Sequence, residues 1–526
     1  MRLSALLDAD DPQDASVAHS SQMRAPSASS FISADPEIRG LTADSRHVDK
    51  GFLFAAIKGY GLDGRDFIPQ AVEKGAVAIL SDLDAVIPEE VIAVRDVAPR
   101  ACLARCASRF YDKAPENLYG VTGTNGKTST AYFAAQLFEA LGQRSASVGT
   151  LGALSADNAI EISIGHTTPD PVTLHAALSS LAEAGVRSAI LEASSHGLSQ
   201  DRLAGVLFDG AAFSNITQDH LDYHTDFSAY FNAKARLFRD CVKEGGFAVI
   251  NMDGPGAEDM ARLARERGLR VIETGANGAD LTLKALEATP RGLRICLTYL
   301  DTTHDLHLPV IGAFQAQNAL LAAGLALGAG FPIDAIIEKL TTLSAPPGRM
   351  QCAASSTGLV GKHISGQDNT DQNGFAAYVD YAHTPDAITA ALAAIRPHAT
   401  SKVIAVVGAG GDRDARKRVP MGAAAVAGAD HVIITDDNPR SEDPAIIRAE
   451  VLKGASSAPS AAQTKIEEIG DRRAAIKAGI RALKKGDVLL VLGKGHETGQ
   501  IIGDRVLPFD DVKEVEAAFE VGKGVS

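Results

Sequence analysis

The sequence predicts an α/β protein of three domains. The chain has 526 residues, and at about 100–200 residues per domain this length favours two to four hydrophobic cores. Short apolar runs alternate with helix-like segments along most of the chain, which is typical of α/β folds. Breaks in this alternation divide the chain into residues 1–112, 113–346 and 347–526.

The first region, residues 1–112, predicts a small N-terminal α/β domain. Residues 9–38 are rich in Ser, Ala, Asp and Pro and have no apolar periodicity, so we expect a flexible stretch there. After it, three apolar runs predict strands and one periodic segment predicts a helix. The strands are expected at Gly51–Ile57, Val77–Leu80 and Val91–Val94, and the helix at Ile68–Lys74.

The second region, residues 113–346, predicts a central α/β domain of the P-loop ATPase type. The apolar run Leu118–Thr122 leads into a glycine-rich loop and then into an expected helix, Ser129–Leu141. Pro-Pro-Gly at 346–348 marks the boundary to the third region. Further strands are expected at Ala189–Leu191 and Phe247–Ile250, and a long helix at Ala316–Leu327.

The third region, residues 347–526, repeats one strand–loop pattern three times and predicts a Rossmann-like α/β domain. Each time a continuously apolar run, as a buried parallel strand requires, ends in polar or glycine-rich residues. Ligands of open α/β sheets bind at the carboxyl ends of the strands, so we expect the three loops to share one site. Residues 355–374 are polar and predict an exposed loop. The runs are Val403–Val407, His431–Thr435 and Val488–Leu492, and their loops are Gly408–Arg413, Asp436–Arg440 and Gly493–Glu497.

The composition argues against nucleic-acid partners. Asp and Glu outnumber Lys and Arg by 65 to 51, which gives a formal net charge of −14 and repels polyanions. Aromatic residues make up 5% and tryptophan is absent, so a stacking platform for single-stranded nucleic acid is not expected. A local basic pocket for a small anion is still compatible with this balance.

Cysteine usage and hydropathy favour a cytoplasmic protein. The five cysteines form no CxxC pair and no metal-ligand spacing, and a chain of this size needs no disulfide staples. The longest uncharged apolar segment, Ala319–Ile333, is interrupted by three glycines and a proline, so we expect a buried helix rather than a membrane span. We therefore expect a cytoplasmic protein with no membrane insertion. Separately, we expect a monomer.

The segment Val121–Thr128, Val-Thr-Gly-Thr-Asn-Gly-Lys-Thr, predicts a phosphate-binding loop. Glycines between a strand and a helix let backbone N–H groups surround a phosphate, Lys127 neutralises its charge, and the Thr128 hydroxyl reaches Mg²⁺. The general P-loop pattern has its first glycine where this chain has valine, so the loop is a variant with Gly120 and Gly123 on either side. The alternative, a chance glycine turn, is disfavoured by the strand–loop–helix context.

Three further residues indicate a metal site near that loop. Glu192 ends an apolar run, where a carboxylate is costly unless it is paired or binds a metal. Taken alone, His220 is typical of a structural histidine, and Lys234 of a solvated lysine on an amphipathic helix. Beside a nucleotide loop, metal binding becomes the favoured interpretation, because nucleotide phosphates need Mg²⁺ and Mg²⁺ takes few protein ligands.

Several motifs in one order resemble those of the Mur ligases, a family of ATP-dependent carboxylate–amine ligases. The resemblance runs from about Leu41 to the C-terminus, and the segments before residue 40 and at 355–374 depart from it without touching a motif. Within the family it is closest to the branch that adds a diamino acid to a UDP-linked muramoyl dipeptide. The motifs are Thr122–Thr128, His166–Asp170, Glu192 with Ser194–Gly197, Asp219–His220, Ala233–Lys234, Gly312–Asn318, Gly348–Arg349, Asp380–His383, Asp437–Arg440 and Gly493–Glu497.

The resemblance implies a reaction in which ATP phosphorylates a substrate carboxylate and an amine attacks the acyl phosphate. It implies ATP, two Mg²⁺ ions and a CO₂-derived carbamate on Lys234. The implied catalytic residues are Lys127, Lys234, His220 and Glu192, and the implied metal ligands are Thr128, Glu192, His220 and Lys234. The implied ATP contacts are Gly123, Thr124, Asn125, Gly126, Lys127, Thr128, Ser129, Asn318, Arg349 and His383.

The resemblance also implies the other two substrates, UDP-MurNAc-L-Ala-D-Glu and meso-2,6-diaminopimelate, and hence a role in peptidoglycan precursor synthesis. For the nucleotide-sugar peptide the implied contacts are Ser45, Tyr60, Gly61, Leu62, Thr167, Thr168, Ser195, Gln200 and Arg202. For the two threonines, an ordinary turn before a proline is an equal alternative. For the diamino acid the implied contacts are Arg413, Asp437, Asn438, Pro439, Arg440, Gly493 and Glu497.

Arg440 would hold the distal carboxylate of the diamino acid with two parallel hydrogen bonds, and Arg413 would assist. Glu497 and the backbone of Gly493 would take the distal ammonium. The alternative for Arg440 is an ion pair with Glu442 or Asp443 in a surface turn.

Two other functions are compatible with parts of the sequence. Folylpolyglutamate synthetase shares the overall plan, but the Asp-Asn-Pro-Arg and Thr-Thr-Pro segments are not expected in it. A P-loop GTPase or motor would use nucleotide only to change shape, and this function leaves the three loop motifs of the third region without a role.

Overall fold

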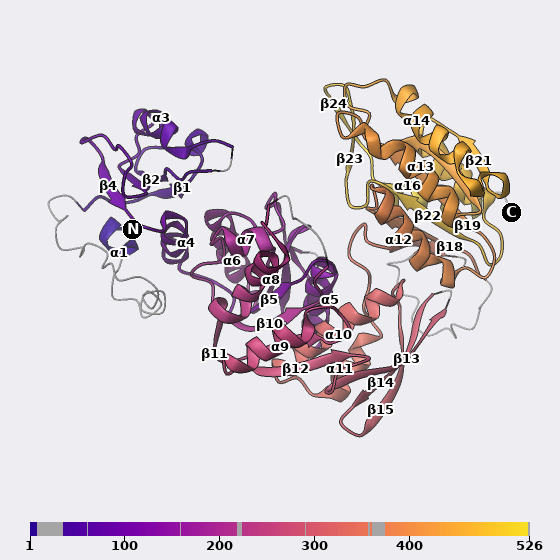
Figure 1. The fold of residues 1–526 in the computed structure, drawn as a ribbon, viewed down its shortest axis with the longest axis horizontal. Helices are drawn as coiled ribbons and strands as arrows, with labels where there is room; N and C mark the ends of the chain where they lie inside the picture. Colours follow the sequence, from indigo (N-terminus) through magenta and orange to yellow (C-terminus); the bar gives the residue numbers. More distant parts are fainter. Residues whose placement is uncertain are drawn as a thin grey trace. The chain divides into compact units, whose positions relative to one another are not determined.

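The structure is a computed structural model that describes residues 1–7, 35–59, 61–157, 159–217, 223–289, 291–355, 358–359 and 374–523. The chain forms two compact units (Figure 1). The first comprises Met1–Ile272 and Gly328–Gly330, and the second Glu273–Leu327 and Phe331–Ser526.

The first unit begins with a small α/β domain built on a four-stranded parallel sheet. Alternate residues of a strand face opposite sides: Leu53 packs in the core that contains Leu103 of α4, whereas its neighbour Phe54 packs with Ile68 of α3. The three expected strands and the expected helix are confirmed. The elements are α1 (Leu3–Leu6), β1 (Gly40–Thr42), β2 (Phe52–Ala55), α3 (Ile68–Glu73), β3 (Ala78–Ser81), β4 (Ile92–Arg95) and α4 (Pro99–Phe110).

The rest of the first unit is a larger α/β domain with strand order β11-β10-β5-β9-β6-β7-β8. Strand β5 lies between β10 and β9 and is parallel to both, so the loops that follow these three strands meet at one edge. The strands are β5 (Asn117–Thr122), β6 (Ser145–Gly149), β7 (Gly152–Ser155), β8 (Glu161–Ile162), β9 (Ser188–Glu192), β10 (Phe208–Phe213) and β11 (Val242–Asn251). The helices are α5 (Lys127–Ala140), α6 (Pro171–Glu183), α7 (Ser195–Ser199), α8 (Phe227–Arg236), a π-helical turn at Leu237–Cys241, and α9 (Ala257–Glu266).

The second unit starts with an antiparallel meander that the sequence did not predict. Its strands are β13 (Leu281–Thr289), β14 (Gly292–Tyr299) and β15 (Thr302–Leu308), and β13 pairs in parallel with the end of β12 (Arg270–Gly275). Two helices follow, α10 (Ala313–Gly328) and α11 (Ile333–Leu340). The expected buried helix is therefore confirmed within α10, but it ends at Gly328.

The second unit continues with an α/β domain whose strand order is β17-β16-β18-β22-β19-β20-β21. Side chains of β19 alternate between two cores, one formed with α12, α13 and α14 and the other with α15 and α16. The three expected strands, β22, β19 and β20, are adjacent and parallel, so their carboxyl ends lie at one edge. The strands are β16 (Gln351–Ser355), β17 (Gly358–Leu359), β18 (Ala376–Asp380), β19 (Val403–Ala409), β20 (His431–Asp436), β21 (Lys465–Glu468), β22 (Val488–Leu492), β23 (Gly499–Ile502) and β24 (Arg505–Pro508). The helices are α12 (Pro385–Ile395), α13 (Arg418–Gly428), α14 (Pro444–Ser457), α15 (Arg472–Ala482) and α16 (Asp511–Lys523).

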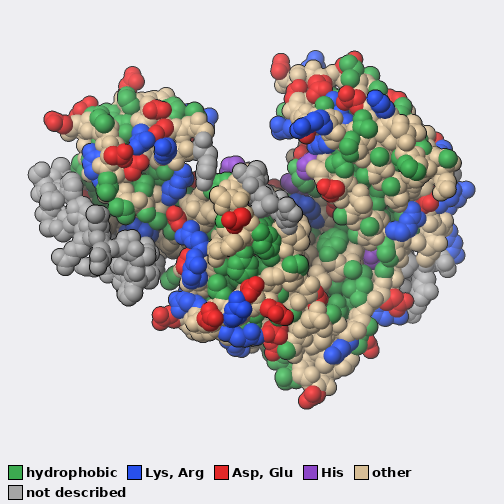
Figure 2. Space-filling view, in the orientation of Figure 1, with side chains coloured by type: hydrophobic (Ala, Val, Ile, Leu, Met, Phe, Trp, Pro, Cys, Tyr) green, Lys and Arg blue, Asp and Glu red, His purple; other side chains and the backbone are tan. Residues whose placement is uncertain are grey.

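Surface and thiol properties agree with the composition. On the face drawn in Figure 2, Lys and Arg side chains lie among Asp and Glu side chains on the described parts of the chain. All five cysteines are free thiols. Within the described ranges, no helix is long and apolar enough to cross a membrane. Most of the two segments expected to be flexible or exposed, 9–38 and 355–374, lies outside the described residues.

Candidate active site

The glycine-rich loop connects β5 to α5, and its geometry suits a phosphate. Gly123 has φ +149° and Gly126 has φ +88°, and a side chain at Gly123 would collide with the hydroxyl of Ser214. Asn215 fixes the loop, because its backbone carbonyl accepts the Thr124 N–H at 2.8 Å and its side-chain oxygen accepts the Asn125 N–H at 3.1 Å. The first N–H groups of α5 have no partner within the helix, which is the usual basis of anion binding at this position.

Two lysines contact this loop. The Lys127 ammonium donates to the carbonyl oxygens of Gly123 and Thr124, both at 2.9 Å. Lys234, on α8, donates to the same Gly123 carbonyl at 2.8 Å and lies over the Tyr230 ring, 4.4 Å from its centroid. Lys234 is 1% exposed, so the alternative that it is a solvated lysine on the surface of a helix is wrong.

Glu192 ends β9 beside the loop and is 3% exposed. Its oxygen Oε2 accepts the Thr128 hydroxyl at 2.9 Å and the Thr150 hydroxyl at 3.3 Å, and Oε1 accepts the Thr150 N–H at 2.8 Å. A carboxylate beside two hydroxyls is an all-oxygen donor set that fits Mg²⁺, which is a hard cation. His220, the other expected ligand, lies outside the described residues.

Four of the residues expected to contact the sugar peptide belong to one hydrogen-bonded group beside Glu192. Thr167 contacts Thr150 hydroxyl to hydroxyl at 3.0 Å, and the Thr168 hydroxyl donates to the Glu192 carbonyl at 2.7 Å. Arg202 donates to the Thr168 carbonyl at 2.6 Å and to the side-chain oxygen of Gln200 at 3.0 and 2.7 Å. Ser195 is buried in the first turn of α7. The hydroxyl of Thr168 is used within the fold, and binding of the sugar peptide through Thr167, Thr168, Ser195, Gln200 and Arg202 stays a prediction.

The residues expected to contact uridine diphosphate lie in the first α/β domain. The Ser45 hydroxyl donates to the Gln70 side chain at 2.7 Å. Gly61 and Leu62 lie in an exposed loop, where the Leu62 carbonyl accepts the Gly59 N–H at 2.9 Å. Tyr60 lies outside the described residues.

Three of the expected ATP contacts lie in the second unit. Asn318, on α10, is 4% exposed and donates to the Gln315 side chain at 2.9 Å. The guanidinium of Arg349 lies 5.3 Å from the centroid of the Tyr381 ring, and the His383 ring lies 4.6 Å from the same ring.

Two buried nitrogens near Tyr381 lack a hydrogen-bond partner among the described residues. They are Arg349 Nε and Nδ1 of His496, whose ring lies 5.4 Å from that of Tyr381. Burial lowers the pKa of His496, so its ring is neutral at neutral pH. Such unsatisfied polar atoms are expected where a polar ligand binds.

The loops after β19, β20 and β22 contact one another at the edge of the second unit's sheet. Gly411 donates its N–H to the Asn438 carbonyl at 2.9 Å, and the Arg440 guanidinium donates to the Gly411 carbonyl at 2.7 Å. Arg440 has φ +54°, and its backbone is tied to β23 because its N–H donates to the Ile501 carbonyl at 3.0 Å.

The alternative surface ion pair of Arg440 is not formed among the described residues. Glu442 instead pairs with the buried Arg418 at 2.7 Å, and Asp443 accepts the Ala445 N–H at the start of α14. Arg413 is exposed in the loop after β19.

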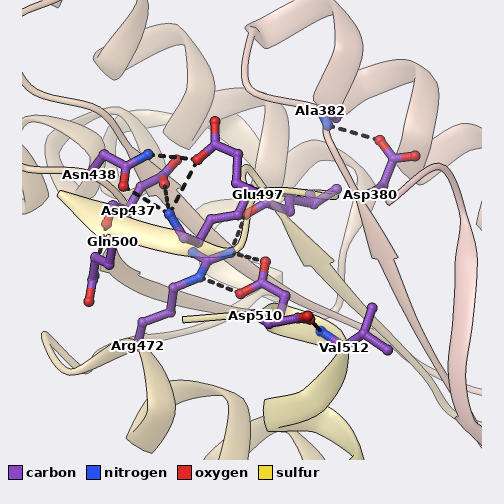
Figure 3. A network of polar contacts seen from close by, with 12 residues as sticks. Asp380, Ala382, Asp437, Asn438, Arg472, Glu497, Gln500, Asp510 and Val512 are labelled. Carbon is purple, nitrogen blue, oxygen red and sulfur yellow. Dashed lines mark hydrogen bonds and ion pairs between the residues drawn. The ribbon is translucent and has the colours of Figure 1, made fainter. Parts of the chain in front are cut away.

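A buried polar network joins the loops after β20 and β22 (Figure 3). Lys494 is completely buried, and its ammonium donates to the Asn438 side-chain oxygen at 2.8 Å, to Glu497 at 3.3 Å and to Asp437 at 3.5 Å. The Asn438 amide donates to Glu497 at 2.8 Å. Gly493, with φ +119°, precedes Lys494 and lies against the Asp437 carboxylate, and Pro439 separates Asn438 from Arg440.

Comparisons with known proteins identify the family. The chain matches the Mur ligase family catalytic domain over residues 37–111, the Mur ligase middle domain over 121–326 and the Mur ligase glutamate ligase domain over 367–495. The chain belongs to the Mur ligase family.

Relatives within the family are similar to this Mur ligase over nearly their whole length. UDP-N-acetylmuramoyl-L-alanyl-D-glutamate–2,6-diaminopimelate ligase of Caulobacter vibrioides is 45% identical over 93% of this chain and 97% of the relative. The ligase of the same name from Zymomonas mobilis is 44% identical over 92% and 95%. A solved structure of a ligase of that name matches with TM-score 0.67 at 33% identity, over 92% of this chain and 95% of the other.

Sequence reasoning missed two residues of this Mur ligase that contact expected site residues. Thr150 joins Thr128, Thr167 and Glu192, but a threonine at the end of a short strand carries no distinguishing pattern. Lys494 lies between two selected residues of a glycine-rich motif, and its only signal was a lysine one residue beyond a continuously apolar run.

Proposed function

We propose that this protein is an ATP-dependent ligase that joins meso-2,6-diaminopimelate to the D-Glu carboxylate of UDP-MurNAc-L-Ala-D-Glu through an acyl phosphate. The product is a muramoyl tripeptide used in peptidoglycan synthesis. The observation that carries the proposal is the arrangement of one arginine, Arg440, and one carboxylate, Glu497, in contacting loops of a Mur ligase. Two opposite charges in one site suit the zwitterionic end of a diamino diacid. We further propose that the enzyme acts as a monomer in the cytoplasm.

The phosphate loop would hold ATP. Lys127 and the N–H groups at the start of α5 would bind the β- and γ-phosphates, while Thr128 and Glu192 would hold Mg²⁺ at their adjacent oxygens. Mg²⁺ would neutralise the phosphate charge that develops during transfer. Asn318 would contact the adenine, and Arg349 and His383 would contact the nucleotide when bound.

Lys234 would carry a carbamate and, with His220, help to hold a second Mg²⁺. Carbamylation consumes a neutral amine, and the Lys234 nitrogen lies against the phosphate loop at the Gly123 carbonyl. Lys234 is almost completely buried, which supports this role.

The chemistry needs the substrate carboxylate close to the γ-phosphate and a neutral attacking amine. Phosphorylation turns a carboxylate oxygen into a leaving group, and the attacking nitrogen then displaces phosphate to form the amide. Thr167, Ser195, Gln200 and Arg202 would orient the sugar peptide, with Ser45 and the loop Tyr60–Leu62 on the uridine diphosphate. Arg440, assisted by Arg413, would bind the distal carboxylate of the diamino acid, and Glu497 its distal ammonium.

Phosphate release separates this function from its alternatives. The purified protein is supplied with ATP and Mg²⁺, with and without UDP-MurNAc-L-Ala-D-Glu and meso-diaminopimelate, and the products are identified by mass. We expect phosphate and tripeptide in equal amounts only when both substrates are present. Hydrolysis independent of the amine would indicate a nucleotide switch, and activity with a folate and glutamate would indicate a folylpolyglutamate synthetase.

A further inference from the structure

Lys494 is a completely buried ammonium at the junction of the loops after β20 and β22. It follows Gly493 directly after β22, and it contacts Asp437, Asn438 and Glu497. A buried charge is retained in a fold only when partners compensate for its lost hydration. Here three acceptors from two loops compensate for the lost hydration of the Lys494 ammonium.

The first consequence concerns the orientation of the Asn438 amide. Its oxygen accepts from the Lys494 ammonium at 2.8 Å and from the Ile501 N–H at 3.0 Å. Both groups can only donate, so the side chain cannot flip without placing its NH₂ against two donors. The amide NH₂ must therefore face Glu497, to which it donates at 2.8 Å.

The second consequence concerns the Glu497 carboxylate. Its oxygen Oε2 accepts both the Asn438 amide and the Lys494 ammonium. No other described residue hydrogen-bonds its second oxygen, Oε1, and the side chain is 35% exposed. Figure 3 shows Asn438 and Glu497 facing one another. The carboxylate is thus held by one oxygen, and the other is left to accept from a ligand.

The third consequence concerns charge. Asp437 and Glu497 contribute two negative charges and Lys494 one positive charge to the hydrogen-bonded cluster, and Lys417 is a further cation that acts on Asp437. The neighbouring Arg472 and Asp511 form a completely buried pair at 2.6 Å and are neutral together. Lys494 reaches Glu497 at 3.3 Å through one oxygen, and an ammonium group is a cation that the other oxygen, Oε1, can bind.

We propose that Lys494 is a positioning residue for recognition of the substrate's distal ammonium. It fixes the Asn438 amide and the Glu497 carboxylate without touching the substrate itself. This inference rests on the proposed function, because it assumes that the amine substrate carries a distal ammonium beside a distal carboxylate.

The test compares two amines in wild type and Lys494→Met. L-2-Aminopimelate keeps the attacking amine and the distal carboxylate of meso-diaminopimelate but lacks the distal ammonium. We expect Lys494→Met to lower kcat/KM for meso-diaminopimelate by about 30-fold or more, as for the loss of one partner of a buried charge pair. For L-2-aminopimelate the loss is expected to be within about threefold, and the KM values for ATP and the sugar peptide within about twofold.

A matched control is Lys513→Met, which removes an exposed lysine of α16 that faces Asp510 at 3.7 Å and should leave both amines unaffected. If Lys494→Met does not fold, by circular dichroism and thermal unfolding, the same ratio is measured in Lys494→Gln. Equal losses for the two amines, or no loss for either, in the folded variant would overturn the inference. A wild-type enzyme that makes no product with meso-diaminopimelate would instead overturn the proposed function.

Discussion

The ammonium nitrogen of Lys234 lies 2.8 Å from the carbonyl oxygen of Gly123, so a residue from α8 contacts the phosphate loop more than a hundred positions earlier in the chain. The start of α8 is fixed by Asp226, which accepts the Ala229 N–H at 2.8 Å. Tyr230, one turn before the lysine, contacts the Thr124 hydroxyl at 3.0 Å. Helix α8 therefore holds Lys234 against the loop through two independent contacts.

Lys234→Ala should abolish turnover, because it removes the group that would carry the carbamate. A short carboxylic acid such as acetate, added to the medium, should restore part of the activity by occupying the space of the lost carbamate. The measurement is tripeptide formation against acetate concentration. Lys243→Ala, at a half-exposed lysine paired with Asp209 at 2.7 Å, is the control. An alanine variant at 234 with wild-type activity and no added acid would contradict the carbamate.

Lys127→Ala should remove ATP consumption and leave the fold intact. The Lys127 ammonium donates to the loop carbonyls of Gly123 and Thr124, and no apolar packing depends on its charge. Loss of a charged group that stabilises transferring phosphate is expected to lower kcat by about 100-fold or more. Thermal unfolding checks the fold, and phosphate release checks catalysis. Undiminished phosphate release would be incompatible with the nucleotide assignment.

Arg440→Gly should weaken recognition of the amine substrate without making the protein less stable than Arg440→Ala. Arg440 has φ +54°, a conformation that glycine adopts without strain, so this variant should be at least as stable as Arg440→Ala. Both variants should lose preference for meso-diaminopimelate over L-lysine and L-ornithine, because an unmatched distal carboxylate costs roughly 2–5 kcal/mol. Product formation with the three amines in parallel measures this preference. Equal use of lysine and diaminopimelate by the wild type would refute the arginine's role.

His175 should make the stability of the first unit depend on pH. It is 4% exposed on α6, and burial lowers its pKa to about 4. Since the unfolded chain binds the proton near pH 6.5 and the folded protein only near 4, stability falls as the pH drops through this window. The loss is roughly 2 kcal/mol between pH 7.5 and pH 5.

His175→Leu removes the titrating group, so the difference in unfolding free energy between these two pH values should shrink by that amount. Urea unfolding at pH 7.5 and pH 5 measures it in both proteins. The same pH dependence in wild type and variant would show that other groups are responsible.

The strands that run continuously apolar were predictable from the sequence, because burial on both faces leaves no room for polar residues. Val488–Leu492 follows this rule along its whole length and His431–Asp436 over its central residues 432–434, and both match the expected strands closely. The meander of β13 to β15 was missed for the opposite reason. Its strands expose many side chains, as in Thr302–Leu308, so their sequence carries charged and polar residues that conceal the strand pattern.

Site residues could be predicted where a sequence motif implies a mechanism. They could not be predicted where their role depends on burial in the folded protein. Gly123 and Thr128 follow from the chemistry of phosphate loops. The burial of Lys234 and Lys494 does not, because a lysine in isolation is typical of the surface, and only the packed structure shows what surrounds it. Contacts between residues distant in sequence, such as that of Thr150 with Glu192, likewise require the sheet order.

The residues proposed to choose the amine all follow β19, β20 and β22, within one continuous stretch from Gly408 to Ile502. The residues proposed to hold the phosphates and Mg²⁺ lie in a separate earlier stretch, from Gly123 to Lys234. A single recombination event could therefore replace the whole amine-choosing stretch and leave acyl activation untouched.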